Sequence, residues 1–256
     1  MKLAFITGAS SGIGQALALR FYKAGYRLAL VVRREQGTQS WAKACGIRHK
    51  DCEIYSADAA DINSLIAAAH TCMAHQGLPD VVVANAGMSV GVDTSLREDL
   101  DVMAQILQVN TLGVAATFSP FIAPMLARGH GTLVGMGSVA GIRGLPGHGA
   151  YCASKAGVIS YCESLRGELR PQGVKVVTLC PGYVDTPMTK GNPYPMPFLM
   201  TPAAFADKAF RAIESGASYR VIPWQMGVLA KLLRCLPNAL FDWALQGQPR
   251  DRKSVV

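Results

Sequence analysis

The sequence is poor in charge and has no long uninterrupted hydrophobic run, and each shortage excludes a class of protein. Charged residues make up 16% of the 256 residues, against about a quarter in an average soluble domain, while half of the chain is apolar. Such a composition excludes an intrinsically disordered chain. Because no charge-free apolar stretch of about 18 residues occurs, a membrane-spanning helix is not expected. The chain is predicted to fold into a compact globular protein.

Basic clusters and cysteine pairs at metal-binding spacing are also missing. The 25 basic and 17 acidic residues give a net charge of +8, yet no run of five basic residues and no nucleic-acid-binding motif is present. The seven cysteines include no C-x-x-C pair, which favours buried thiols in a reducing compartment over a metal site or a disulfide framework. We therefore expect no nucleic-acid partner, no metal and a cytoplasmic location.

Short apolar runs alternate with longer helical patterns, the order typical of β-α-β units around a parallel sheet. Several runs are apolar on both faces, as expected for strands covered by helices on both sides. Asp61 and Thr201 are suited to helix N-caps. Strands are predicted at Leu3–Thr7, Arg27–Val32, Glu53–Ser56, Val81–Ala84, Thr132–Met136, Lys175–Leu179 and Tyr219–Ile222, and helices at Ile13–Ala24, Asp61–His75, Leu100–Leu126, Tyr151–Leu169 and Pro202–Ser215.

A glycine-rich turn, Thr7-Gly8-Ala9-Ser10-Ser11-Gly12-Ile13-Gly14, joins the first predicted strand to the first predicted helix. Such a turn directs backbone N–H groups and the positive helix end toward a diphosphate. Gly8 would permit the tight turn, Gly12 would let the phosphates approach, and Gly14 would let helix and strand pack closely. An ordinary strand-to-helix turn can carry the same glycines, so the motif alone is a weak signal.

The end of the second predicted strand indicates which dinucleotide binds. NAD-binding folds place an acidic residue near this point to hold the ribose 2′-hydroxyl, whereas an arginine accommodates a 2′-phosphate. Val32 and Arg33 stand here, followed by Arg34, and no carboxylate occurs before Glu35. The alternative is a solvated strand end in which both arginines are incidental. The missing acid favours NADP(H) over NAD(H).

Tyr151 and Lys155 are four positions apart in a predicted helix, so they share one face. A nearby ammonium favours the phenolate, which is expected to lower the tyrosine pKa toward the range of a general acid or base. Ser138 follows the fifth predicted strand, at the sheet edge where open α/β folds bind ligands, and could hold a substrate carbonyl oxygen. The Tyr-x-x-x-Lys pair alone proves little, because such pairs are common on helix surfaces.

Together these elements resemble the short-chain dehydrogenase/reductase family over about residues 2–190. The order is Thr7-Gly8-x-x-x-Gly12-Ile13-Gly14, Asp58, Asn85-Ala86-Gly87, Asn110, Ser138, Tyr151-x-x-x-Lys155, and Pro181-Gly182 before Thr186. One departure is Ala84, where the family often has asparagine. The resemblance implies a Rossmann-type, doubly wound α/β fold with a seven-stranded parallel sheet, in a single domain over residues 1–256.

The resemblance also implies a role for each matching residue. Tyr151 would be the acid/base, Lys155 would hold the nicotinamide ribose and lower the tyrosine pKa, Ser138 would orient the substrate, and Asn110 would support a proton-relay water. Asp58 would bind the adenine, Asn85-Ala86-Gly87 would back the cofactor, and Thr186 would approach the carboxamide. The implied cofactor-binding residues are Gly8, Ser10, Ser11, Gly12, Ile13, Gly14, Arg33, Arg34, Asp58, Asn85, Ala86, Gly87, Tyr151, Lys155, Pro181, Gly182, Val184 and Thr186.

The predicted function is NADP(H)-dependent interconversion of a carbonyl and an alcohol on a small apolar substrate, by a homodimer or homotetramer. The alternative is a catalytically silent nucleotide-binding regulator or scaffold of the same fold. An isomerase or dehydratase that retains its cofactor is a further hypothesis, which net NADPH consumption would exclude.

Two segments outside the motifs are assigned to the substrate side. Residues 186–215 are predicted to include a lid, whose Met188, Met196, Phe198, Leu199 and Met200 either wall an apolar substrate or pack on the fold. Residues 223–256 form an apolar C-terminal extension with helical spacing of its hydrophobic positions. A subunit interface or a pocket cover is favoured for it over contact with a membrane, in which Lys231, Arg234, Arg250, Arg252 and Lys253 would face lipid headgroups.

Overall fold

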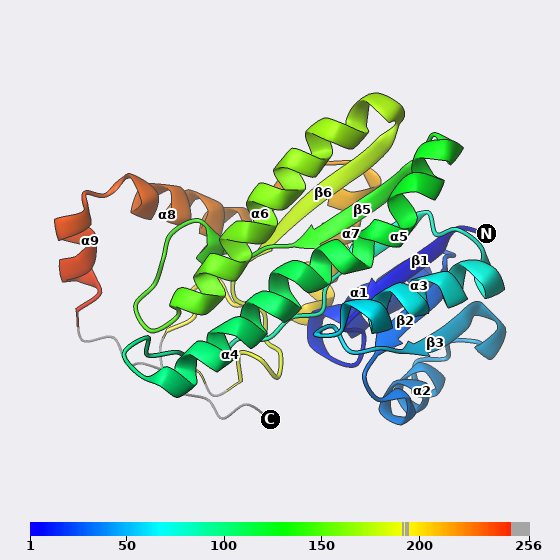
Figure 1. Cartoon of the computed structure of the whole chain (residues 1–256), viewed down its shortest axis with the longest axis horizontal. Coiled ribbons are helices and arrows are strands. Elements are labelled where there is room, and N and C mark those ends of the chain that lie inside the picture. The colour runs from blue at the N-terminus through cyan, green and yellow to red at the C-terminus, as the bar shows by residue number, and fades with distance from the viewer. Residues whose placement is uncertain (191, 193–194, 247–256) are drawn as a thin grey trace.

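A parallel sheet of seven strands forms the centre of the protein (Figure 1), in a computed structural model that describes residues 1–190, 192 and 195–246. The strand order is β3-β2-β1-β4-β5-β6-β7, and every neighbouring pair is parallel. The chain winds outward from β1 in one direction and then from β4 in the other, which is the predicted doubly wound arrangement. The strands are β1 (Leu3–Thr7), β2 (Arg27–Val32), β3 (Cys52–Ser56), β4 (Val81–Ala84), β5 (Gly131–Met136), β6 (Val174–Pro181) and β7 (Tyr219–Ile222).

Helices cover both faces of the sheet because alternate strand residues point to opposite sides. Ile6 and the other strand side chains on the same face of the sheet pack with α1 (Gly12–Lys23), α2 (Glu35–Ala44) and α7 (Pro202–Glu214). Phe5 and its equivalents pack with α3 (Ile62–Gln76), α5 (Gly113–Arg128) and α6 (Gly149–Leu169). Each face thus has its own apolar core, so the strands are buried on both sides as their composition predicts.

The predicted strands are all present, with ends that differ by at most two residues. Asp61 and Thr201 cap their helices as expected: Asp61 accepts from the backbone N–H groups of Asn63 and Ser64, and the Thr201 hydroxyl accepts from that of Ala204. Helix α2 was not predicted, because Gly37, Thr38 and Ser40 are weak helix formers that tertiary packing overrides.

The prediction of one continuous helix over Leu100–Leu126 is wrong. Helix α4 (Arg97–Leu107) is followed by a π-helical turn at Gln108–Leu112 before α5 begins. A π turn inserts one residue into the helical repeat and changes the direction of the side chains that follow, often at functional positions. The expectation that no stretch is long and apolar enough to span a membrane is wrong, because the run Arg97–Arg128 passes that test by length and composition. Phe118, Phe121 and Met125 of this run are fully buried, as in the core helix of a globular domain.

The segment assigned to a lid has two parts. Pro202–Glu214 is helix α7, which packs on α1 and contributes Phe205, Ala209 and Phe210 to the core, so the boundary at residue 215 is too long. Residues 186–200 are left for the lid, which itself stays a prediction; 191, 193 and 194 lie outside the described residues. Beyond β7 the chain forms α8 (Trp224–Cys235) and α9 (Asn238–Ala244), which extend away from the sheet (Figure 1). Arg250, Arg252 and Lys253 lie outside the described part of the chain.

Candidate active site

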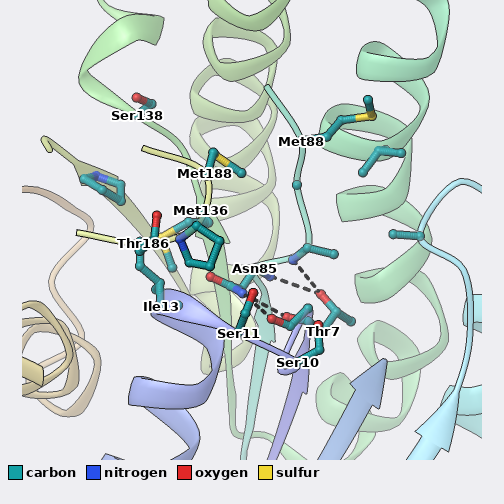
Figure 2. Close-up of a pocket in the computed structure, with 18 of the residues that line it drawn as sticks. Thr7, Ser10, Ser11, Ile13, Asn85, Met88, Met136, Ser138, Thr186 and Met188 are labelled. Atoms are coloured by element: carbon teal, nitrogen blue, oxygen red, sulfur yellow. Dashed lines mark hydrogen bonds between the residues drawn. The ribbon is translucent and has the colours of Figure 1, made fainter. Parts of the chain in front are cut away.

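A cavity of about 370 Å³ opens at the carboxyl edge of the sheet, beside the point between β1 and β4 where the strand order reverses. Open α/β sheets bind ligands at such a switch point. Figure 2 shows Thr7, Ser10, Ser11 and Asn85 gathered at one end, with Ser138 and Met88 on opposite sides of the other end and Met188 between Ser138 and Asn85. The cavity brings together most of the predicted site residues: Gly8, Ser10, Ser11, Gly12, Ile13, Arg33, Asp58, Asn85, Ala86, Gly87, Ser138, Tyr151, Lys155, Pro181, Gly182, Val184 and Thr186.

Three predicted site residues do not line the cavity, namely Gly14, Arg34 and Asn110. Gly14 lies in the first turn of α1, where a Cβ would overlap the carbonyl oxygen of Gly8. Arg34 is exposed at the N-cap of α2, beside the cavity residue Arg33. Asn110 is fully buried behind the wall.

The glycine turn packs its backbone against Ala86 and Thr186 too closely for side chains at Gly8 and Gly12. Gly8 and Gly12 have φ values of +66° and +54°, a region that L-residues with a Cβ rarely adopt. A Cβ on Gly8 would come within 2.7 Å of the Ala86 Cα, and one on Gly12 within 3.0 Å of the Thr186 side chain. Ser10, Ser11 and Gly12 line the cavity, and because α1 begins at Gly12, the first unpaired backbone N–H groups of the helix lie at this end. We call residues 8–12 the glycine cradle.

Thr7 and Asn85 join the ends of β1 and β4 under this turn. The Asn85 side-chain amide donates to the carbonyl oxygens of Thr7 and Gly8, at 3.1 and 3.2 Å. The Thr7 hydroxyl accepts from the backbone N–H groups of Asn85 and Ala86, both at 3.1 Å. These bonds fix the two strand ends at one spacing (Figure 2), so the glycine cradle is rigid before any ligand arrives.

Asn110 lies within the π-helical turn and connects two walls of the cavity. Its side-chain carbonyl accepts from the Met88 N–H at 2.8 Å, while its amide donates to the Met88 carbonyl and the Ser154 hydroxyl, both at 2.9 Å. The Ser154 hydroxyl in turn donates to the Tyr151 carbonyl at 2.8 Å. Asn110 therefore ties the loop after β4 to the helix that carries Tyr151.

Ser138, Tyr151 and Lys155 converge from two elements. Ser138 follows β5 and is held by a hydrogen bond from the Ala140 N–H to its hydroxyl, whereas Tyr151 and Lys155 lie in α6. Lys155 is 4% exposed, its Nζ donates to the Met136 carbonyl at 2.9 Å, and it lies 5.8 Å from the centre of the Tyr151 ring. A phenol, a hydroxyl and a buried ammonium thus face one cavity.

The Tyr151 pKa differs from the sequence expectation. Burial raises the pKa of Tyr151 above its ordinary value, while a hydrogen bond with Ser138 opposes the rise. Burial also lowers the pKa of Lys155 to about 8. The prediction that the lysine lowers the tyrosine pKa considers the ammonium alone, whereas in the folded chain the loss of water around the phenol raises that pKa.

The chain is similar in sequence to known proteins over most of its length. A family model for short-chain dehydrogenases matches residues 2–194. The chain belongs to the short-chain dehydrogenase family. It is 37% identical over 246 residues to an uncharacterized oxidoreductase of Myxococcus xanthus, an alignment that covers 95% of this chain and 96% of the relative. It is 30% identical over 189 residues to the 3-oxoacyl-acyl-carrier-protein reductase of Escherichia coli, covering 74% and 76%.

The solved structures give the same fold. A short-chain dehydrogenase from Streptomyces avermitilis superposes with a TM-score of 0.78 at 22% sequence identity, covering 95% of this chain and 97% of that one. Short-chain dehydrogenases are oxidoreductases that use NAD or NADP, and this chain is an oxidoreductase of that family. Its residues fit such a dinucleotide, because Gly8, Ser10, Ser11 and Gly12 line the cavity at the start of α1, where backbone N–H groups and the positive helix end favour a diphosphate.

Several residues in the cavity wall or behind it could not be singled out from the sequence. The sequence marks Thr7 only as part of the glycine motif, although its hydroxyl accepts hydrogen bonds that hold the ends of β1 and β4 together. Ser154 carried one usable signal, since it lies three positions after Tyr151 on the same helix face. Met188 is named in the sequence as a candidate for an apolar wall and does line the cavity, whereas Gln105, Val109, Met136 and Thr189 line it with no motif that marks them.

Proposed function

We propose that this short-chain dehydrogenase interconverts a carbonyl and an alcohol on a small apolar substrate and prefers NADP(H). The observation that carries the proposal is the convergence of Ser138, Tyr151 and Lys155 on the same cavity as the glycine cradle. A binding protein without turnover needs the cradle but has no use for a phenol, a hydroxyl and a buried ammonium placed together.

Each of the three side chains has a separate task. When bound, a nicotinamide dinucleotide supplies or accepts the hydride. The Ser138 hydroxyl orients the substrate oxygen, and the Tyr151 hydroxyl gives a proton to that oxygen or takes one from it. Lys155 brings positive charge near the phenol, which favours the phenolate when the tyrosine acts as a base. Asn110 positions α6 through Ser154, so it acts on Tyr151 indirectly.

The preference for NADP(H) rests on Arg33. This arginine is exposed, lines the cavity at the end of β2, and has no carboxylate paired with it among the residues that the structure describes. A guanidinium matches a phosphate oxygen pair in geometry and charge. An NAD-binding site would place a carboxylate near this point, where Val32 and Arg33 stand.

An apolar substrate is supported by the methionines around the cavity. Met88 and Met136 line it, and Met188 reaches it from the expected lid. Methionine adapts its shape to irregular apolar ligands. The 3-oxoacyl reductase among the relatives acts on a 3-oxoacyl group, which is a carbonyl on an apolar chain, and this chemistry suits such a wall.

The proposal is tested by following NADPH oxidation against a panel of apolar, polar and sugar carbonyls, with NADH in parallel. We expect turnover of at least one apolar class and a higher kcat/KM with NADPH. Tyr151→Phe serves as the control for background oxidation. An absence of turnover on the whole panel, with NADPH still bound in a titration, would favour the silent regulator instead.

The assembly and location are further parts of the proposal, and each is measured separately. We propose a homodimer or homotetramer in the cytoplasm, the first because family members commonly oligomerise and the second because the thiols Cys72, Cys152, Cys162 and Cys180 are free and buried. Light scattering of the purified chain and fractionation of the source cells give the two answers.

A further inference from the structure

Helices α8 and α9, residues Trp224–Ala244, present an exposed apolar surface that the catalytic proposal does not use. We call this segment the C-terminal arm. Trp224, Val228 and Leu232 recur at every fourth position of α8, so they form one stripe along the helix. Leu240 and Trp243 are exposed on α9. The exposed fractions of Trp224, Leu232 and Trp243 are 68%, 63% and 70%, which is unusual for large apolar side chains.

The opposite side of the arm is packed on the fold, so the exposure does not come from an unattached chain end. Met226 and Ala230 are buried, and a Cβ on Gly182 would come within 2.7 Å of the Met226 side chain. A Cβ on Gly227 would come within 3.0 Å of the Val221 side chain of β7. Because Gly182 itself lines the cavity, the inner side of the arm adjoins the wall of the active site.

Arg143 fixes the arm further along. It lies in the loop after Ser138, and its guanidinium donates to the carbonyl oxygens of Leu233 and Leu236 at the end of α8. It also donates to the Asn238 side chain and stacks on the Phe241 ring, 3.7 Å from its centre. One cation thus caps α8 and holds α9 against it, so the outer stripe is a preformed surface.

The charges around the stripe have one predominant sign. Lys231 and Arg234 are exposed on α8, and Asp242 is the single acidic residue between Trp224 and Gln246. At 100° per residue, Lys231 lies about 20° from Trp224 around the helix axis, so its ammonium borders the apolar stripe. The whole chain carries a net charge of +8, which favours an anionic partner.

We propose that the outer face of the C-terminal arm docks on an anionic lipid surface. Exposed tryptophans beside aliphatic residues suit the boundary between headgroups and acyl chains, where an indole keeps its N–H in the polar layer. Lys231 at the border of the stripe, and Arg234 about 60° further around the helix on the same side, would meet lipid phosphates in the manner of an interfacial amphipathic helix. The buried inner side leaves the arm lying on the surface and not crossing it.

A second copy of the chain fits this face less well. A twofold contact between two arms would bring the Lys231 and Arg234 charges of both copies into one interface with a single acid from each. The arm also projects from one end of the molecule (Figure 1), where a flat bilayer can reach it. Docking would place the adjoining cavity near the membrane, where apolar carbonyl compounds concentrate.

Vesicle binding of the full chain tests the proposal. Protein is sedimented with vesicles of phosphatidylcholine alone and of phosphatidylcholine mixed with phosphatidylglycerol, at low and moderate salt. We expect binding to the anionic vesicles that weakens as salt is added. Trp224 and Trp243 are two of the three tryptophans, and the third, Trp41, packs against the core, so tryptophan emission should shift to the blue on binding.

Two pairs of variants separate the apolar and ionic contributions. Trp224→Ser with Trp243→Ser should weaken binding about tenfold or more and remove the blue shift. Lys231→Glu with Arg234→Glu should weaken it by about 20-fold or more, since each basic group near an anionic surface contributes roughly fivefold. Leu100→Ser and Lys43→Glu, exposed residues on α4 and α2, are the matched controls and should bind as the wild type does. Unchanged NADPH binding and circular dichroism verify the fold of each variant.

The exposed thiol of Cys235 at the end of α8 gives an independent readout. A polarity-sensitive dye on this thiol should brighten with anionic vesicles and stay unchanged with neutral ones. The proposal is overturned if the wild type stays in the supernatant at low salt, or if the arm variants bind like the controls. It is also overturned, in favour of a contact between copies, if the wild type ignores vesicles while the tryptophan variants dissociate an oligomer in light scattering.

Discussion

The two ends of the cavity differ in what forms them: backbone groups at one end and side chains at the other. At the glycine turn, the geometry is held by backbone groups and by the short bonds among Thr7, Asn85 and Ala86, where an added Cβ would collide with neighbouring atoms. At the other end, Met188 is 42% exposed and contacts the cavity from an irregular segment. Many proteins can share the glycine-turn end because its geometry depends on few side chains. The end near Met188 is formed by side chains, so we expect it to determine which substrate binds.

Tyr151 stands between the two ends, and its loss should have the largest effect. Tyr151→Phe removes the proton-carrying hydroxyl and leaves the ring, so kcat should fall at least ~10²-fold while NADPH affinity stays close to normal. Steady-state kinetics and a cofactor titration measure the two quantities. Tyr161→Phe is the matched control, because Tyr161 lies in the same helix and stacks on Phe118 away from the cavity. Near-normal turnover by Tyr151→Phe would mean that another group carries the proton.

A substitution at Lys155 tests whether a buried catalytic ammonium lowers the free energy of unfolding. Burial lowers its pKa from 10.5 to about 8, so the charged form is disfavoured in the folded state by about 3 kcal/mol. Between pH 8 and 10.5 the unfolded chain holds more protons than the folded one, and the stability of the wild type therefore rises with pH in that window. Lys155→Met should stabilise the protein by about 2 kcal/mol at pH 7, after the lost bond to Met136, and abolish most of the activity.

The stabilisation should shrink as the pH approaches 10.5, because the wild type then loses the buried charge. Urea unfolding at pH 7 and at pH 9.5 gives the comparison, and titrations common to both proteins cancel in the difference. Lys208→Met, an exposed lysine of α7, should show no such pH dependence. A Lys155→Met protein that is less stable than the wild type at pH 7 would show that the hydrogen bond to Met136 outweighs the desolvation.

The sheet and the cofactor end could be predicted because their signals are local. Strands such as Val81–Ala84 are runs of apolar residues, and Gly8, Gly12 and Gly14 stand next to one another in the chain as they do in space. Helix α2 and the π turn at Gln108–Leu112 had no such signal. Their conformations are decided by packing with distant residues, as the contact of Asn110 with Met88 and Ser154 shows.

The rest of the site and the arm depend on contacts between parts of the chain far apart in sequence. Arg143 meets the carbonyl of Leu236, 93 positions later, and no periodicity encodes that pair. The Tyr151 pKa depends on how completely water is excluded, which four-residue spacing does not report. The apolar spacing of α8 indicated a helix but could not tell which stripe would be buried, because Met226 and Leu232 are equally apolar in the sequence.

At the cofactor end, the proposed preference for NADP(H) depends on one side chain, that of Arg33. Arg33→Asp should weaken NADPH binding far more than NADH binding, because a carboxylate adds repulsion and removes a charge-assisted contact of roughly 1.5–3 kcal/mol. Titrations of both cofactors with both proteins measure the change. Arg34→Asp is the matched control, since Arg34 lies outside the cavity lining and should change the preference less. An unchanged preference in Arg33→Asp would show that this guanidinium points to solvent.

A substitution of Met188 should give the smallest effect, because this side chain is partly exposed and lies in an irregular segment that can adjust to the change. Met188→Ser removes part of the apolar wall, and since the side chain is only partly covered, kcat/KM for apolar carbonyls should fall roughly fivefold, with NADPH affinity and the rate on polar carbonyls little changed. Leu199→Ser is the control, because Leu199 belongs to the same segment and is exposed to a similar degree but does not line the cavity. If both variants lower kcat/KM equally, the segment acts by covering the site as a whole. If neither does, the apolar wall lies elsewhere, with Met88 and Met136 the residues to change next.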